Sequence, residues 1–580
     1  MGLKYNPNLD MTFYKTLLLS GIAFSFAACG PDKAAEIDGL ANADIEKGWC
    51  ISGGPIYTAL DSQPTVEAVA VTSGEITYAG PETDQWCQSE TAQRINLNGA
   101  ALYPGLTDGH AHLIGIGLRE MTLNLEGTDS IEALKSQLSD ELEKVEDGQT
   151  VYGRGWIETH WPEKRFPTRQ DLDDVAPDNP VILTRADGHA SVVNSLALEK
   201  SGIDKVTEAP FGGAINLGED GEPTGMLIDK AQDLVSELMP SLTPERRREA
   251  YIKGAELYAS RGWANLHSMS VEPNDIALMQ ELANSEDIKI RVYNSIDLQN
   301  NRAMPTMETD TAENDLITTR AIKLYADGAL GSRGAALLAP YSDDPDNEGL
   351  MTLKEVQVEA FLETALRNGI QVNTHAIGDR ANRYVLQWYK DAFETVPKSS
   401  WKVEDPRWRV EHAQIVDVED IPLFAEYGII PSMQPSHAIG DLHFAVDRLG
   451  KKRLEGGYAW RSLIDSGSII VGGSDAPVEV GDPRIEFYAA TQRKDMEGYS
   501  DENWYPEEKV SRQEALKMFT IWPAYASFEE DRLGTIEVGK RADFSAFQTD
   551  LMTAPGPDIL TSQPLFTMVN GKMAFDGRGN

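Results

Sequence analysis

The feature that most restricts the fold of this chain is a regular alternation of short apolar runs with longer stretches of helical periodicity. Such an alternation predicts β/α units and a parallel sheet. Eight runs resemble buried strands, and eight is the number that closes a (β/α)8 barrel of the TIM type. These runs are residues 100–103, 264–269, 288–295, 321–325, 370–374, 408–411, 429–433 and 469–472.

Two more strand-like runs, at 150–153 and 181–184, do not fit this pattern of eight units. We assign them to an insertion of about residues 140–240, after the first barrel strand. The barrel itself is expected to occupy residues 101–528.

The two ends of the chain have a different pattern from the middle. Residues 46–100 and 529–580 alternate apolar and polar side chains with frequent glycines, as is typical of hairpins. The pair Asn570-Gly571 is a strong signal for a tight turn. We therefore predict that both ends pair into one small β-sandwich domain.

Side chains suited to metal binding follow several of the predicted barrel strands. His110 and His112 lie two residues apart, a spacing that turns both imidazoles to one side of an extended chain. Because the carboxyl ends of barrel strands meet at one face, later residues could join them there. These are Lys323, His375, His412 and Asp475. Such nitrogen and oxygen ligands suit zinc or a similar divalent ion.

The charge balance excludes one class of partner. The chain has 52 Lys and Arg against 92 Asp and Glu, which gives a net charge of −40. Nucleic-acid binding needs a basic patch, so we expect no nucleic-acid partner. We interpret the acidity as solubility of an exported surface.

Residues 1–29 are typical of an export signal. Lys4 and Lys15 precede an apolar segment, residues 17–28, that is too short to span a bilayer. The following residues 26–30, Phe-Ala-Ala-Cys-Gly, resemble a bacterial lipobox, which implies lipid attachment to Cys29. The protein would then be anchored to a membrane of the cell envelope, with residues 30–45 as a tether. Ordinary signal-peptidase cleavage near the same alanines is the alternative, and Met11 is a second candidate start.

The chain has three cysteines. With Cys29 assigned to lipid, Cys50 and Cys87 remain as an even pair in an oxidising compartment. We predict a disulfide between them in the N-terminal β segment. A catalytic thiol is the weaker alternative, because neither lies near the histidines in sequence.

Taken together, the motifs resemble the amidohydrolase superfamily, in particular its family 3 branch, which includes N-substituted formamide deformylases. The resemblance runs from about residue 46 to the C-terminus. The segments that carry it are Pro104-Gly-Leu-Thr-Asp-Gly-His-Ala-His112, residues 323–335 (Lys-Leu-Tyr-Ala-Asp-Gly-Ala-Leu-Gly-Ser-Arg-Gly-Ala), His375-Ala-Ile-Gly-Asp-Arg-Ala381, Glu411-His-Ala-Gln414, Ser432-Met-Gln-Pro435 and Gly473-Ser-Asp-Ala-Pro477.

The resemblance implies a role for each candidate ligand. His110, His112 and Asp475 would hold one metal, and His375 and His412 a second. Lys323 stands where many members of the superfamily carry a lysine carboxylated by CO2 that bridges both ions. The alternative is an ordinary amine beside a single metal.

The resemblance also implies a reaction, the hydrolysis of a C–N bond by a metal-activated water. Asp475 would be the general base, and His412 or another histidine would stabilise the oxyanion. The substrate would be a small N-acyl or N-formyl amine or a cyclic amide. Two alternatives stay open: an ester, lactone or organophosphate as substrate, and a lipoprotein that binds metal or ligand without catalysis.

Four residues are candidates for substrate contact: Trp156, His189, Arg333 and His437. Packing and hairpin geometry are the alternative explanation for the first three. The oligomeric state is left open, with a homo-oligomer as one option.

Overall fold

The protein is described here by a computed structural model. It describes residues 48–83, 85–87, 91–158, 161–186, 188, 190–210, 213–298, 310–311, 315–501 and 504–579. Contacts divide the chain into Met1–Ile45 and Glu46–Asn580. The predicted export signal, Cys29 and the tether therefore lie outside the described residues, and everything below concerns the second unit.

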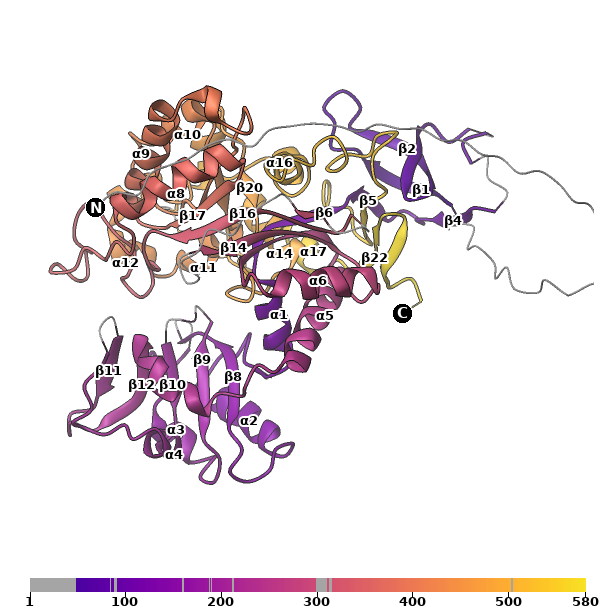
Figure 1. Ribbon diagram of the computed structural model, residues 1–580. Coiled ribbons are helices and arrows are strands. Elements are labelled where there is room, and N and C mark those ends of the chain that lie inside the picture. Colours follow the sequence, from indigo (N-terminus) through magenta and orange to yellow (C-terminus); the bar gives the residue numbers. More distant parts are fainter. Residues whose placement is uncertain are drawn as a thin grey trace, which may run out of the picture. The chain divides into compact units, whose positions relative to one another are not determined.

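Eight parallel strands form the barrel, as predicted (Figure 1). Their order is β20-β19-β18-β17-β16-β14-β13-β6. The bounds are β6 Leu106–Ala111, β13 Trp263–Val271, β14 Arg291–Asp297, β16 Ile317–Tyr325, β17 Gln371–Ala376, β18 Arg409–His412, β19 Ile430–Met433 and β20 Val471–Gly472. The ring is closed beyond β20, where the Asp475 amide donates to the His110 carbonyl at 2.6 Å and the His112 amide to the Ala476 carbonyl at 2.8 Å.

The first barrel strand is not the one that we expected. The apolar run at 100–103 forms β5 (Ala101–Pro104), which pairs with strands of the terminal sheet instead. Gly105 separates β5 from β6, and a Cβ there would lie 2.8 Å from the Ala264 Cβ and 2.9 Å from the Asp543 Cβ. The chain thus passes between two packed bodies with no room for a side chain. We took this Pro-Gly pair as the end of the strand, whereas the barrel begins after it.

Helices alternate with the barrel strands and cover them. α5 shows how the sequence sets its bounds: the Thr243 side chain accepts from the Arg246 amide, proline occupies the first turn, and Gly262 ends the helix at φ 106°. The bounds are α1 Leu113–Glu120, α5 Pro244–Arg261, α6 Asp275–Asn284, α8 Glu355–Asn368, α9 Asp379–Thr395, α10 Ile421–Tyr427, α11 Pro435–Asp441, α12 Ala445–Leu449, α13 Trp460–Asp465, α14 Pro483–Gln492, α15 Arg512–Met518 and α16 Ile521–Ala526. The described helices are too short or too polar to span a lipid bilayer.

An insertion follows α1 and contains its own sheet, in the order β11-β12-β10-β9-β8-β7. It starts at Leu123, earlier than the predicted residue 140, and its 3-10 helix ends at Leu238. Its elements are β7 Leu123–Asn124, α2 Ile131–Leu142, β8 Val151–Trp156, α3 Arg169–Asp173, β9 Val181–Arg185, β10 Ala190–Val193, α4 Ser195–Lys200, β11 Gly213–Leu217, β12 Pro223–Asp229 and η2 Lys230–Leu238.

The two chain ends pair with each other, and their strands form one continuous hydrogen-bonded sheet. Its strands are β1 Trp49–Tyr57, β2 Thr65–Thr72, β3 Glu75–Gly80, β4 Gln93–Asn96, β5, β21 Phe544–Phe547, β22 Pro564–Val569 and β23 Lys572–Asp576; α17 (Gly556–Thr561) precedes β22. One apolar cluster joins side chains of both ends, among them Ile51, Leu102 and Phe544. The predicted disulfide between Cys50 and Cys87 is present.

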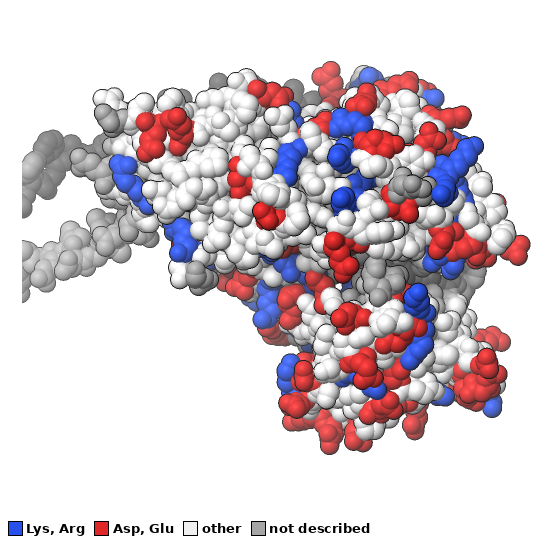
Figure 2. All heavy atoms as spheres, turned by 180° about the vertical axis from the view of Figure 1, so that it is seen from behind, with Lys and Arg blue, Asp and Glu red and all other residues white. Residues whose placement is uncertain are grey.

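Acidic side chains are spread over the surface with basic ones among them, as Figure 2 shows for one face. The interpretation of the acidity as solubility of an exported surface stays a prediction.

Candidate active site

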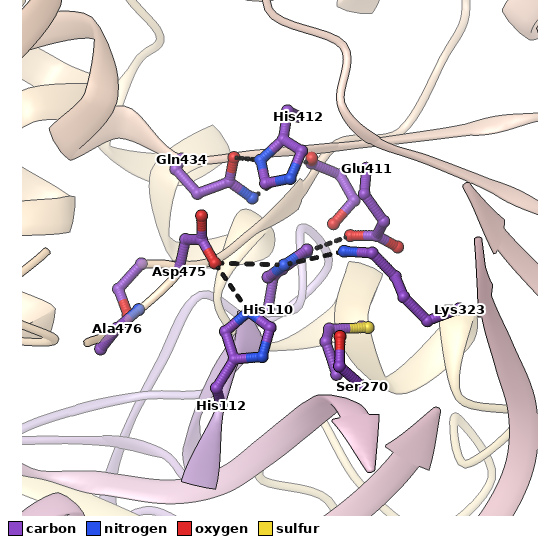
Figure 3. A network of polar contacts seen from close by, with 12 residues as sticks. His110, His112, Ser270, Lys323, Glu411, His412, Gln434, Asp475 and Ala476 are labelled. Atoms are coloured by element: carbon purple, nitrogen blue, oxygen red, sulfur yellow. Dashed lines mark hydrogen bonds and ion pairs between the residues drawn. The ribbon is translucent and has the colours of Figure 1, made fainter. Parts of the chain in front are cut away.

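Three buried side chains meet at the carboxyl ends of the barrel strands: His110 at the end of β6, His412 at the end of β18, and Asp475 after β20. Each offers one ligand atom, and these atoms all lie within 4.8 Å of one another. Figure 3 shows them pointing toward one another from separate strands. The sequence placed them far apart, and the barrel brings them into a group that could hold a metal ion.

The His110 imidazole is oriented by a buried carboxylate. Its Nδ1 is bonded to Glu411, which is fully buried, while its Nε2 lies 3.3 Å from the Asp475 Oδ1 and 3.3 Å from the Lys323 Nζ. A histidine that donates one ring N–H to a carboxylate presents the lone pair of its other nitrogen as a ligand. His110 is therefore arranged as a metal ligand through Nε2.

Asp475 is shared by both residues of the His-x-His motif. Its Oδ1 lies 3.1 Å from the His112 Nε2 and 3.3 Å from the His110 Nε2. Burial alone would raise the pKa of Asp475, but the charges and hydrogen bonds of His110 and His112 outweigh it and hold that pKa well below its ordinary value. The carboxylate is therefore ionised at neutral pH.

His412 is held by Gln434, whose Oε1 lies 2.8 Å from its Nδ1. Burial, followed by the charge of His375, lowers the pKa of His412 well below its ordinary value, so the ring is neutral. Since a neutral ring that donates from Nδ1 has only a lone pair at Nε2, His412 is arranged as a ligand. This geometry argues against its predicted role as an oxyanion donor.

Backbone strain marks the same positions. His412 has φ 72° and Asp475 has φ 61°, both in the left-handed region that non-glycine residues rarely occupy. Such strain persists where the surrounding structure requires it, and it often occurs at functional sites.

Two predicted ligands lie beside this group rather than in it. His112 reaches the group only through Asp475. The His375 ring centroid is 4.5 Å from that of His412, but its Nε2 lies 3.3 Å from the Asp327 Oδ1. The structure therefore brings all the predicted ligands together, with His112 and His375 at the edge.

Lys323 is 1 % exposed and reaches the centre from β16. Burial lowers the pKa of its amine to about 8, although Glu411 and Asp475 act in the opposite direction. A minor fraction of this lysine, about one tenth at pH 7, is therefore uncharged, and this is the form that can react with CO2.

The sequence analysis missed a buried charge network under the site. The Arg409 guanidinium is fully buried; it pairs with Glu411 and donates to the His267 Nδ1 at 2.9 Å and to the Ser432 Oγ at 2.7 Å. A signal was available, since Arg409 and Glu411 are two apart on a strand predicted to be buried. Charged residues are rarely buried unless they are paired for a purpose.

The contact between Glu411 and His110 leads to a testable prediction about metal affinity. Replacing Glu411 with glutamine removes the charge that orients His110, so we expect metal affinity to fall by about 10- to 100-fold. Metal titration of the purified variant measures this. Glu508 is the matched control, because it is also buried but accepts from the Ser462 amide in α13. Its glutamine variant should keep the metal affinity; an unchanged affinity in the Glu411 variant would contradict the orienting role.

The three described candidates for substrate contact lie in different environments. Trp156 is fully buried in the core of the insertion and donates to the Leu183 carbonyl at 2.8 Å, so it cannot touch substrate. Arg333 pairs with Asp343 at 2.9 Å. His437 lies beside the site, with its Nε2 3.7 Å from the Asp475 Oδ2. His189 lies outside the described residues.

A cavity of about 800 Å³ opens next to the site. Residues of the insertion, such as Tyr152 and Met239, line one side, and Asp327 and Gly328 of the loop after β16 line the other. One of the lining residues, Asp327, has its Oδ1 3.3 Å from the His375 Nε2. Its size suits a small organic molecule.

Known proteins resemble this chain over most of its length. The model of the Amidohydrolase family matches residues 93–575. The protein YtcJ of Bacillus subtilis is 31% identical over 541 residues, which cover 90% of this chain and 98% of the relative. An N-substituted formamide deformylase of Arthrobacter pascens is 27% identical and covers 89% and 96%. An uncharacterized metal-dependent hydrolase of Pyrococcus horikoshii has the same fold, with a TM-score of 0.70 at 24% identity over 88% of this chain and 99% of its own.

A parallel β/α barrel with a buried His/Asp group at its carboxyl end defines a hydrolase of the amidohydrolase type. The chain belongs to the Amidohydrolase family. This confirms the resemblance drawn from the motifs.

Proposed function

We propose that the protein hydrolyses the C–N bond of a small amide, either an N-acyl or N-formyl amine or a cyclic amide. The observation that carries this proposal is the group of His110, His412 and Asp475, in which one carboxylate oxygen is held and the other is left for proton transfer. The N-substituted formamide deformylase among the relatives supports the choice of bond.

The donor set fits a zinc-like ion. His110 and His412 offer imidazole nitrogens, Asp475 offers an ionised carboxylate, and all three are buried. These residues would hold one ion, and His112, His375 and Lys323 are placed to complete it or to hold a second. A bound divalent ion supplies Lewis acidity, which acidifies a water molecule and polarises a carbonyl group.

The residues of the chain would transfer the proton and keep the ligands oriented. The Asp475 Oδ1 faces the histidine nitrogens and would bind the ion with His110, which leaves the Asp475 Oδ2 to accept the proton of the attacking water. The water oxygen forms its bond to the carbonyl carbon, the C–N bond breaks, and the same carboxyl group returns the proton to the leaving nitrogen. Glu411 and Gln434 keep their histidines oriented throughout.

The direct test combines metal analysis with a substrate panel. We expect purified protein to contain a divalent metal and to cleave N-formyl and N-acetyl amines, with activity lost on chelation and restored by zinc. Matched esters and lactones belong in the panel, because the same chemistry attacks them. A metal-loaded protein that cleaves esters but no amide would contradict the proposal.

We further propose that the protein is exported and anchored by lipid on Cys29. The disulfide between Cys50 and Cys87 supports an oxidising compartment. Metabolic labelling with a fatty-acid analogue should mark the wild-type protein and not the Cys29→Ala variant. Labelling of both would contradict attachment at Cys29.

A further inference from the structure

The side of the site next to the Asp475 Oδ2 carries a group that the reaction does not use. His437, in α11, is 8 % exposed, and neither of its ring nitrogens has a hydrogen-bond partner among the described residues. A buried imidazole without partners is costly unless something else fills its hydrogen bonds. Its Nε2 lies 3.7 Å from the Asp475 Oδ2 and 3.8 Å from the Glu479 Oε1. The ring therefore faces a position between two carboxylates.

Glu479 lacks a cation of its own among the described residues. Arg119 is near, but it donates to the main-chain oxygen of Glu479 and pairs with Glu120 at 3.2 Å and Glu126 at 3.1 Å. Burial, then the charges of Asp441, Asp475 and Glu126, raise the pKa of Glu479 to about 8. The pKa is raised because the carboxyl group is buried among other carboxylates, and an entering cation would stabilise its charged form.

The proposed reaction determines that the leaving nitrogen of the substrate lies on the side of His437 and Glu479. The leaving nitrogen is expected to receive its proton from the Asp475 Oδ2, because Oδ1 faces the two histidines and would bind the metal with His110. The next groups beyond that oxygen are His437 and then Glu479, whose side chain is 29% exposed and so can be reached from outside. The substituent on the leaving nitrogen is thus directed toward Glu479.

We propose that this is a subsite for a positively charged amine, so that the preferred substrates are mono-acylated diamines. His437 contacts the leaving nitrogen, and Glu479 pairs with the distal ammonium group. Because the two carboxylates lie 3.7 Å and 3.8 Å from the same ring nitrogen, a short spacer of about three to five carbon atoms would reach from one to the other, given ordinary hydrogen-bond lengths. This inference rests on the proposed amide hydrolysis and adds the class of the leaving group.

The test compares two substrates of equal length, mono-formyl pentanediamine and formyl hexylamine, in which a methyl group replaces the ammonium. We expect kcat/KM to favour the charged substrate by about 10-fold or more, as for other charge-assisted contacts. Because both substrates are measured on one preparation, the ratio does not depend on the folded fraction.

Two variants locate the cause of the preference. In Glu479→Gln the ratio should fall to about one, mainly through loss on the charged substrate. Glu120→Gln is the matched control, because Glu120 is 30% exposed but already paired with Arg119, and its ratio should stay at the wild-type value. Equal rates on both substrates, or a preference that survives Glu479→Gln, would overturn the subsite while leaving the hydrolase in place. Cleavage of neither substrate would count against amide hydrolysis itself.

Discussion

Replacing Asp475 with asparagine is expected to lower kcat by about 100- to 10,000-fold, the range for loss of a positioned general acid–base. The carboxamide has nearly the same shape and keeps an oxygen that can bind metal, but it cannot accept and return a proton. The backbone at φ 61° is one that asparagine tolerates well. The fold should therefore be retained, and the loss should be in kcat rather than in KM.

Metal content, measured on the same sample, separates the two roles of this carboxylate. Loss of turnover with the metal retained supports proton transfer by Asp475, whereas retained turnover would exclude it. Asp543 provides the matched control, because it is 8 % exposed, similar to Asp475 at 7 %, but pairs with Arg291 at the terminal sheet. Its asparagine variant should lose stability and keep its turnover per folded molecule.

The barrel could be predicted from the sequence because its strands are buried on both faces and read as apolar runs. The exception was β6, in which Thr107, Asp108 and His110 are polar although they are buried. Its residues are polar because they build the site, so the apolar run of β5 was taken for the first strand. The polar residues of β6 thus kept this strand from being recognised as part of the barrel.

The ligand set could be predicted because strand ends converge, but the contacts that orient it could not. Glu411 on β18 bonds His110 on β6, and Gln434 after β19 bonds His412 on the neighbouring β18. No spacing in the chain indicates these pairs of side chains. Trp156 was a candidate for substrate contact because its segment resembles the family, with packing as the alternative. Its ring packs in the core of the insertion.

Replacing Lys323 with alanine is expected to lower kcat/KM by on the order of 1,000-fold, comparable to loss of one group that stabilises the transition state. We propose that this lysine works as a carbamate, since a protonated amine has no lone pair to offer a metal. Its pKa of about 8 leaves enough neutral amine to react with CO2. Native mass spectrometry should then show the added mass of one CO2 on the wild-type protein and not on the variant.

Chemical rescue separates the carbamate from a free ammonium at this position. If a carboxylate is the working group, acetate or propionate should restore part of the activity of Lys323→Ala, and methylamine should not. Lys323→Arg keeps the positive charge but cannot form the carbamate, so we expect it to be as inactive as the alanine variant. Rescue by methylamine, or substantial activity with arginine, would show that Lys323 acts through its charge. A lysine that acts as an ammonium group cannot bridge two ions. In that case its buried amine, 3.3 Å from the His110 Nε2, would lie beside a single ion held by His110, His412 and Asp475.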